Sequence, residues 1–233
     1  MSLFEQQEVT CPACGTPQQV EIAFTLNATR RPDLRDAILE RSYQRFACEN
    51  CGQVFRPEPH LAYLDIRRNQ WILAKAVTDV AQWSDFEAAA RVLFDDNYGD
   101  KASEAAQAVG DTLTVRVVFG WSALREKLLI EAAGLDDVTV EYVKVLLLRA
   151  LDETPLADDA ELRFESLGDD DVLRFVWYVG ASETPVEEVE VSRALYDLAV
   201  NDPEPWRALR ETLSAGPFVD MNRLLVPEEA AAA

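Results

Sequence analysis

Four cysteines are the residues of this chain whose type and spacing most clearly predict chemistry. They form two pairs with two-residue gaps, Cys11-Pro12-Ala13-Cys14 and Cys48-Glu49-Asn50-Cys51, and a glycine follows each pair. Glycine lets the backbone turn there and lets amide groups approach the sulfurs. Four thiolates fill the tetrahedral shell that Zn²⁺ prefers and leave no position for water. The pattern therefore predicts a closed, structural zinc site with the ligands Cys11, Cys14, Cys48 and Cys51.

Other uses of the four cysteines remain open. A rubredoxin-like iron site would take the same ligands, so iron is the alternative metal. The first pair alone resembles a thioredoxin-like redox dithiol, but the second pair and the lack of a preceding βαβ pattern disfavour that interpretation. Two disulfides would suit a secreted protein, yet the N-terminus shows no basic region followed by an apolar stretch.

The pattern of apolar residues predicts an α+β fold that begins with antiparallel strands. Val20, Ile22, Phe24 and Leu26 alternate with mostly polar residues, which indicates a half-buried strand leaving the first cysteine pair. The 33 residues between the pairs fit that strand, a short helix from Pro32 and a returning strand over residues 43–47. The arrangement is typical of a zinc ribbon enlarged by an insert.

Further elements follow along the chain. We expect strands at residues 1–10, 61–66, 70–76, 112–119, 161–167, 172–179 and 186–191, with turns at 67–69 and 168–171. We expect helices within 77–110, at 122–133 with Ser122 as cap, from 136 or 137 to about 151, and at about 192–200 and 203–213. Three parts result: a ribbon with a trailing hairpin (1–76), a helical connector (77–110) and a larger acidic α+β domain (111–227).

Several stretches together resemble the CpXC domain, a bacterial and archaeal family named for its paired cysteine motifs. The resemblance rests on residues 11–15, 19–22, 46–52 and 63–65, and extends in a less diagnostic way to 117–127 and 134–137. Glu49 stands where many members carry a proline, which leaves the ligands unaffected. The resemblance implies a zinc-binding domain without an assigned activity.

The charge is distributed unevenly. Residues 1–68 hold 9 acidic and 8 basic side chains, and the rest of the chain holds 33 acidic and 14 basic ones, for a total net charge of −20. Such an acidic surface repels phosphate backbones, so nucleic-acid binding by the C-terminal part is disfavoured. The N-terminal part remains a candidate, through its eight arginines: Arg30, Arg31, Arg35, Arg41, Arg45, Arg56, Arg67 and Arg68.

No catalytic constellation stands out. The motifs of P-loops, zincins and nucleophile elbows do not occur, and the only histidine, His60, is expected in a surface or packing role. On the helix near residue 125 we expect Arg125 and Lys127 in solvent. Asp136 and Asp137 are explained by the dipole of a helix start rather than by a bound cation.

The favoured function is therefore binding. The ribbon would be a structural or partner-recognition module, and the acidic domain a surface for an unidentified protein partner. Nucleic-acid binding through an arginine-rich face of the ribbon is one alternative, and an enzyme with an unrecognised site in the C-terminal domain is the other. No stretch approaches the roughly 20 apolar residues of a membrane span, so we expect a cytoplasmic protein without membrane contact.

Overall fold

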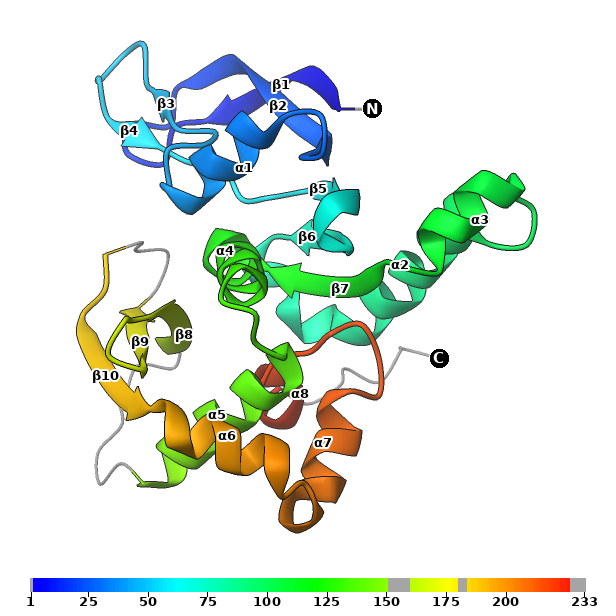
Figure 1. Ribbon diagram of the computed structural model, residues 1–233. Coiled ribbons are helices and arrows are strands. Elements are labelled where there is room, and N and C mark those ends of the chain that lie inside the picture. Colours follow the sequence, from blue (N-terminus) through cyan, green and yellow to red (C-terminus); the bar gives the residue numbers. More distant parts are fainter. Residues whose placement is uncertain (1, 151–159, 180–183, 227–233) are drawn as a thin grey trace, which may run out of the picture. The chain divides into compact units, whose positions relative to one another are not determined.

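Two compact units make up the chain (Figure 1). The computed structural model describes residues 2–150, 160–179 and 184–226. The first unit comprises Met1–Val80 and Ala88–Trp121, and the second comprises Ala81–Glu87 and Ser122–Ala233. Both contain helices and sheets, and the N-terminal strands carry the cysteines, so the predicted α+β class is confirmed. Within the described ranges, no helix is both long and apolar enough to cross a bilayer.

A five-stranded sheet forms the centre of the first unit. Its order is β1 (Leu3–Thr10), β2 (Pro17–Asn27), β5 (Leu61–Asp65), β6 (Gln70–Lys75) and β7 (Thr114–Phe119). The β1–β2 and β5–β6 pairs are antiparallel hairpins, whereas β2–β5 and β6–β7 pair in parallel. The sequence placed residues 112–119 in the C-terminal domain, but β7 completes the sheet of the first unit.

The insert between the cysteine pairs continues from β2 into a helix and turns. It contains α1 (Pro32–Leu39), and the second cysteine pair lies between the short strands β3 (Phe46–Ala47) and β4 (Val54–Phe55). The expected strand over residues 43–47 shrinks to two residues. Arg41 and Gln44 have positive φ angles of 61° and 54°, and this left-handed backbone cannot continue a strand.

The expected helical stretch after β6 contains three elements. They are the 3-10 helix η2 (Val77–Gln82) and the α-helices α2 (Trp83–Tyr98) and α3 (Glu104–Gly110). Ser103 caps α3, since its side chain accepts a hydrogen bond from the backbone N–H of Ala106. The loop between β5 and β6 is the 3-10 turn η1 (Ile66–Arg68), which Asn69 ends with a left-handed φ of 53°.

The second unit has a three-stranded antiparallel sheet in the order β10 (Glu187–Ser192), β9 (Val172–Val179) and β8 (Ala160–Leu167). Its other elements are α4 (Gly120–Ala132), α5 (Asp137–Ala150), α6 (Arg193–Asn201), η3 (Glu204–Trp206), α7 (Arg207–Leu213) and α8 (Asn222–Leu225). Ser192 caps α6 as predicted, but Ser122 does not cap α4, because that helix already begins at Gly120.

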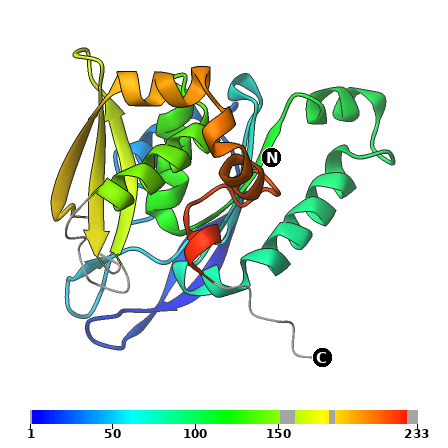
Figure 2. The ribbon, with the colours of Figure 1, turned by 90° about the horizontal axis from the view of Figure 1, so that it is seen from below.

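The core of the second unit lies between this sheet and the helices. Leu162 and Phe164 of β8 and Phe175 and Trp177 of β9 point into one apolar cluster with residues of α5. In Figures 1 and 2, α6 and α7 lie beside α5, and both pack against it. Alternation along the strands thus buries one sheet face beneath the helices.

Candidate metal centre

The two cysteine pairs occupy equivalent turns of two antiparallel hairpins. The first pair connects β1 to β2, and the second connects β3 to β4. In the first turn the N–H of Gly15 donates to the carbonyl of Cys11 at 2.9 Å, and in the second the N–H of Gly52 donates to Cys48 at 2.8 Å. Gly15 and Gly52 have φ angles of 70° and 73°, a conformation that glycine adopts without strain.

All four sulfurs converge on one point. Their Sγ atoms lie within 4.8 Å of one another, with Cys11 3.8 Å from Cys51 and Cys14 3.6 Å from Cys48. A tetrahedral Zn–S₄ shell with bonds near 2.3 Å requires sulfurs about 3.8 Å apart. The four predicted ligands therefore form a cluster with the spacing that such an ion needs, and they fill all its positions.

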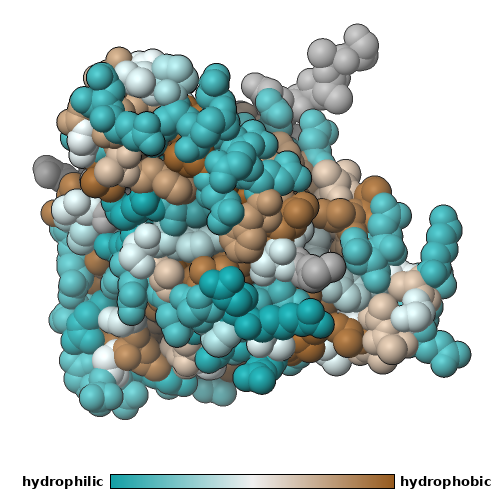
Figure 3. All heavy atoms as spheres, turned by 90° about the horizontal axis from the view of Figure 1, so that it is seen from above, coloured by the Kyte–Doolittle hydropathy of each residue, from teal (hydrophilic) through white to brown (hydrophobic). Residues whose placement is uncertain are grey.

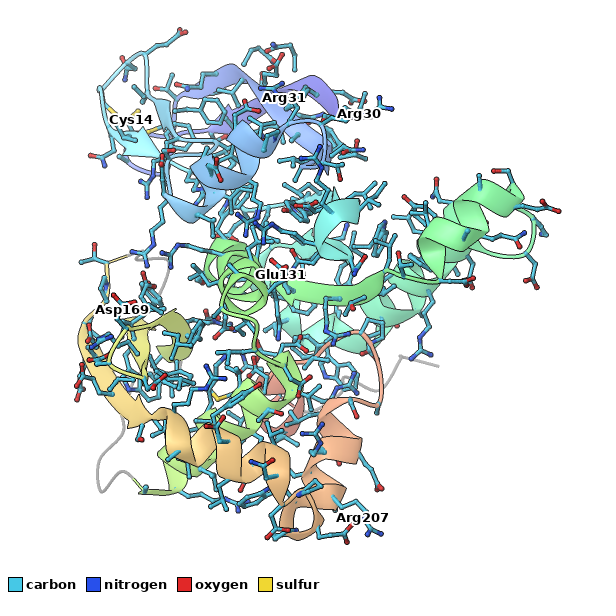
Figure 4. The ribbon with its side chains drawn as sticks, in the orientation of Figure 1. Cys14, Arg30, Arg31, Glu131, Asp169 and Arg207 are labelled. Carbon is cyan, nitrogen blue, oxygen red and sulfur yellow. The ribbon has the colours of Figure 1, made fainter. Side chains whose placement is uncertain are left out.

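One side of the cluster is buried and the other faces solvent. Cys11 and Cys48 are buried against Phe55, Val9 and Phe46, whereas Cys14 and Cys51 are exposed. Cys14 lies at the end of the first unit that carries the two hairpin turns (Figure 4). All four cysteines are free of disulfides. The apolar contacts hold Cys11 and Cys48 in place from inside the unit.

Side chains around the cluster favour the thiolate at one sulfur in particular. Hydrogen bonding with Thr16, and then with Asn50, lowers the pKa of the Cys14 thiol to about 6. The side-chain amide of Asn50 lies 3.7 Å from that sulfur. For Cys51, the backbone hydrogen bond at Gln53 favours the thiolate, but the neighbouring sulfurs outweigh it and raise the pKa to about 12. A cation replaces these shared protons when it binds.

His60 lies outside the cluster. It is exposed, and it does not belong to the group of sulfurs that could hold an ion. Of the surface and packing positions expected for it, the structure shows the surface one.

A second cluster of candidate ligands was missed by the sequence analysis. Oxygens of Glu126, Glu141 and Asp220 also lie within 4.8 Å of one another, and all three residues are buried. The ammonium group of Lys144 lies 2.5 Å from Glu126 and 3.0 Å from Glu141, where it neutralises both carboxylates. This arrangement is a closed ionic network rather than a metal site.

The expectation that Lys127 is solvated is wrong. This residue is only 4% exposed, and its ammonium group lies 3.1 Å from Asp137 and 3.3 Å from Glu141. Arg125 is partly buried and forms a bidentate ion pair with Glu165, with N–O distances of 2.6 and 2.8 Å. Helical periodicity predicted both cations in solvent, because it carries no information about their acidic partners on α5 and β8.

The carboxylates of this network differ in their proton affinity. Burial raises the pKa of Glu141, and its neighbouring lysines only partly counter that effect. Burial acts on Glu126 too, but Lys144 and Arg163 outweigh it and lower its pKa. Burial acts to raise the pKa of Asp220, but Arg163, 2.5 Å away, and Lys144 outweigh it and keep that pKa well below the usual range. The sequences of α4 and α5 gave no sign of this ionic network, because charged residues distributed along a helix are usually solvated.

Three of the eight N-terminal arginines have partners within the first unit. Arg31 pairs with Asp33 at 2.7 Å, Arg35 is buried beside Asp36, and Arg56 stacks over Trp121 at 4.0 Å. Figure 4 shows Arg30 and Arg31 at the other end of the unit from Cys14.

Comparison with known proteins agrees with the metal cluster. No curated protein and no solved structure matches the chain significantly. The pattern of one protein family, described as CpXC protein, matches residues 9–144, which is more than half of the chain and includes all four cysteines. The chain therefore belongs to the CpXC family.

Proposed function

We propose that this protein binds one structural Zn²⁺ through Cys11, Cys14, Cys48 and Cys51, and that the unit so stabilised is a protein-interaction module. The single observation behind the proposal is the convergence of four sulfurs from two matching hairpin turns. A closed four-sulfur shell has no position for a substrate or water, so the ion would stabilise the fold. Zinc suits four thiolates, and iron is the alternative with the same ligands.

The ion would join segments that make few other contacts. The β3–β4 hairpin consists of two residue pairs, too few for stability in water without a further constraint. A cation bound by sulfurs of both turns would fix this hairpin to the β1–β2 hairpin. Binding of the ion and folding of the insert would then be coupled.

A recognition role follows from what remains exposed. On the face shown in Figure 3, hydrophilic residues are interspersed with hydrophobic ones. The acidic residues after position 68 favour a basic protein partner. The carboxylates with shifted pKa values are closed off in ion pairs, so an active site at that network is not supported.

Elemental analysis of the purified protein tests the metal. We expect one zinc per chain in the wild type and loss of zinc in Cys14→Ser, together with faster proteolysis around residues 28–55. Ser42→Ala, a substitution of similar size in the insert outside the cluster, should retain the ion. Full zinc occupancy in Cys14→Ser would contradict the assignment. Detection of one iron per chain in place of zinc would identify iron as the bound metal.

Partner binding is tested with the same variants. Proteins that are captured by wild type and Ser42→Ala but not by Cys14→Ser would support recognition through the ribbon. Equal capture by all three would show that the metal-bound unit does not carry the interaction.

A further inference from the structure

The three-stranded sheet of the second unit has an open edge along β10. The strand order makes β10 and β8 the two edge strands, and Figures 1 and 2 both show β10 as the outermost strand of this sheet. At the β8 edge, the backbone N–H of Phe164 donates to the buried carboxylate of Glu126 at 2.6 Å, so a side chain of α4 takes up part of that edge. Among the described residues, no strand pairs with the outer side of β10.

The hydrogen-bond pattern shows which groups of β10 face outward. Directly after the strand, the N–H of Arg193 donates to the carbonyl of Asp171 at 2.9 Å. Alternate residues of an antiparallel pair bond to the partner strand, so residues 187, 189 and 191 bond to β9. The N–H and C=O groups of Glu188 and Glu190 therefore point away from β9, and no described residue bonds to them. These four backbone groups are available to a further strand.

The side chains along this edge are acidic. Glu187, Glu188 and Glu190 are all exposed. The guanidinium group of Arg174 in β9 lies 2.7, 3.7 and 3.1 Å from three carboxylates, those of Asp170, Glu188 and Glu190. One positive charge among three negative ones leaves this group of side chains negatively charged. The edge therefore attracts basic side chains.

The same charges disfavour a second copy of this chain as the occupant. Two β10 strands paired through their outward groups would bring glutamates opposite each other, and like charges at that spacing are destabilising. Charged residues on edge strands are a common protection against such self-association. A strand with basic residues opposite Glu188 and Glu190 avoids the repulsion and gains attraction, so the charges select against one occupant and for another.

Apolar side chains lie on the other face of the edge. Val189 of β10 and Leu195 of α6 are only partly buried, at the rim of the apolar core. Val186, just before the strand, is 59% exposed. Side chains of a strand alternate between its two faces. An added strand with basic residues against Glu188 and Glu190 would therefore turn its intervening residues toward Val189, where apolar side chains would cover the rim.

We propose that the outer edge of β10 binds an extended segment of a partner protein, with basic side chains at every second position and apolar ones between them. The segment adds a fourth strand to the sheet and bonds to the outward groups of Glu188 and Glu190. It runs antiparallel to β10, because the sheet is otherwise antiparallel and purely antiparallel sheets are favoured over mixed ones. Backbone pairing supplies affinity, and the side chains supply specificity. This site lies in the second unit, so it goes beyond the function proposed for the ribbon.

The test uses the full chain and a fluorescein-labelled peptide of alternating lysine and valine, as long as β10, with binding followed by anisotropy. We expect saturable binding. N-methylation of the lysine amides removes the donors that face β10 and should weaken binding by about tenfold or more. N-methylation of the valine amides, which face away, should leave the affinity unchanged. Equal affinity of the two methylated peptides, a greater loss with methylated valine, or no binding at millimolar peptide would each overturn the proposal.

Variants of the protein separate this edge from its overall charge. In Glu188→Gln/Glu190→Gln the affinity should fall by about two- to thirtyfold, because two cross-strand charge pairs are lost. Asp95→Asn/Asp96→Asn removes the same charge from exposed positions of α2 and should bind like the wild type. Cys14→Ser should also bind like the wild type, which keeps this test separate from that of the ribbon. An equal loss in both double variants, or loss of binding in Cys14→Ser, would overturn the assignment to β10.

Hydrogen exchange locates the bound peptide. The amides of Glu188 and Glu190 should exchange fast in the free protein, and saturating peptide should slow them by about tenfold or more. The amides of Val189 and Val191 bond to β9 and should be protected with and without peptide. Unchanged exchange at Glu188 and Glu190 on binding would overturn the proposal. So would their protection in the free protein together with a dimer on gel filtration, because a second copy would then occupy the edge.

Discussion

The side-chain carbonyl of Gln18 accepts a hydrogen bond from the backbone N–H of Glu49 at 3.2 Å, and this contact joins the two cysteine turns. The same side chain donates to the carbonyl of Ala47 at 3.4 Å. Gln18 belongs to β2, just beyond the first turn, whereas Ala47 and Glu49 flank Cys48 of the second. One glutamine thus holds the two halves of the metal centre in register.

Replacing Gln18 by alanine should weaken metal binding without abolishing it. Hydrogen bonds of this kind contribute about 0.5–1.5 kcal/mol, which corresponds to about a two- to twelvefold loss of affinity. Competition with a chelator measures the change. Gln19→Ala, on the exposed opposite side of the strand, is the matched control and should bind like the wild type. Equal affinities for both variants would show that Gln18 does not support the site.

Gly52→Ala should also weaken metal binding, for a purely conformational reason. A Cβ at this position meets no atom within 4 Å, but the φ angle is 73°. Left-handed backbone costs an alanine about 1–2 kcal/mol, so affinity should fall by about 5- to 30-fold. Gly52→Asn should fall less, because asparagine tolerates this conformation. If alanine and asparagine behaved alike, backbone strain would not be the cause.

Trp121→Phe should destabilise the first unit. The indole Nε1 of Trp121 donates to the carbonyl of Pro57 at 2.7 Å, and phenylalanine cannot replace this bond. We expect the free energy of unfolding to fall by about 1–3 kcal/mol, as measured by denaturant titration with circular dichroism. Trp177→Phe is the control, because the Nε1 of this equally buried residue makes no hydrogen bond within the described residues. If the control lost as much or more free energy of unfolding, the smaller volume of phenylalanine and not the hydrogen bond would explain the effect.

The stability of the second unit should depend on Asp220 in a defined direction of pH. Its pKa is lower in the folded protein than the ordinary value of about 3.9, so its contribution is present above that pH and is lost as the pH falls below it. The contribution of Glu141 to stability has the opposite pH dependence. Its pKa is raised in the folded protein, so the folded state binds the proton more strongly and this contribution is lost as the pH rises.

Asp220→Asn separates these effects. At pH 7 the variant should be less stable than the wild type by about 3–5 kcal/mol, because it leaves Arg163 without one of its buried partners. The difference should shrink as the pH is lowered from 5 to 3. Acid would also release an ion bound at the cysteines, but both proteins carry the same cluster, so that loss would cancel in the comparison. A difference that stays constant across this range would rule out Asp220 as the titrating group.

Local chemistry made the cysteine cluster predictable. Two cysteines with a two-residue gap and a following glycine specify a tight turn by themselves, and the same pattern twice specifies four ligands. The hairpin of β8 and β9 was equally clear, because residues 168–171 form its turn between two alternating apolar runs. Figure 4 shows Asp169 at that turn. Such features need only contacts within a few residues.

Long-range pairing decided the rest. Strand β7 joins the first unit only because its backbone finds β6 in parallel, a choice that its β-branched sequence does not encode. Lys127 has the sequence context of a solvated helix position, and it is buried because Asp137, Glu141 and the carbonyl of Val219 meet it in space. A buried charge is tolerated only beside its partners, and partners as distant as residues 127 and 219 become neighbours only when the chain has folded.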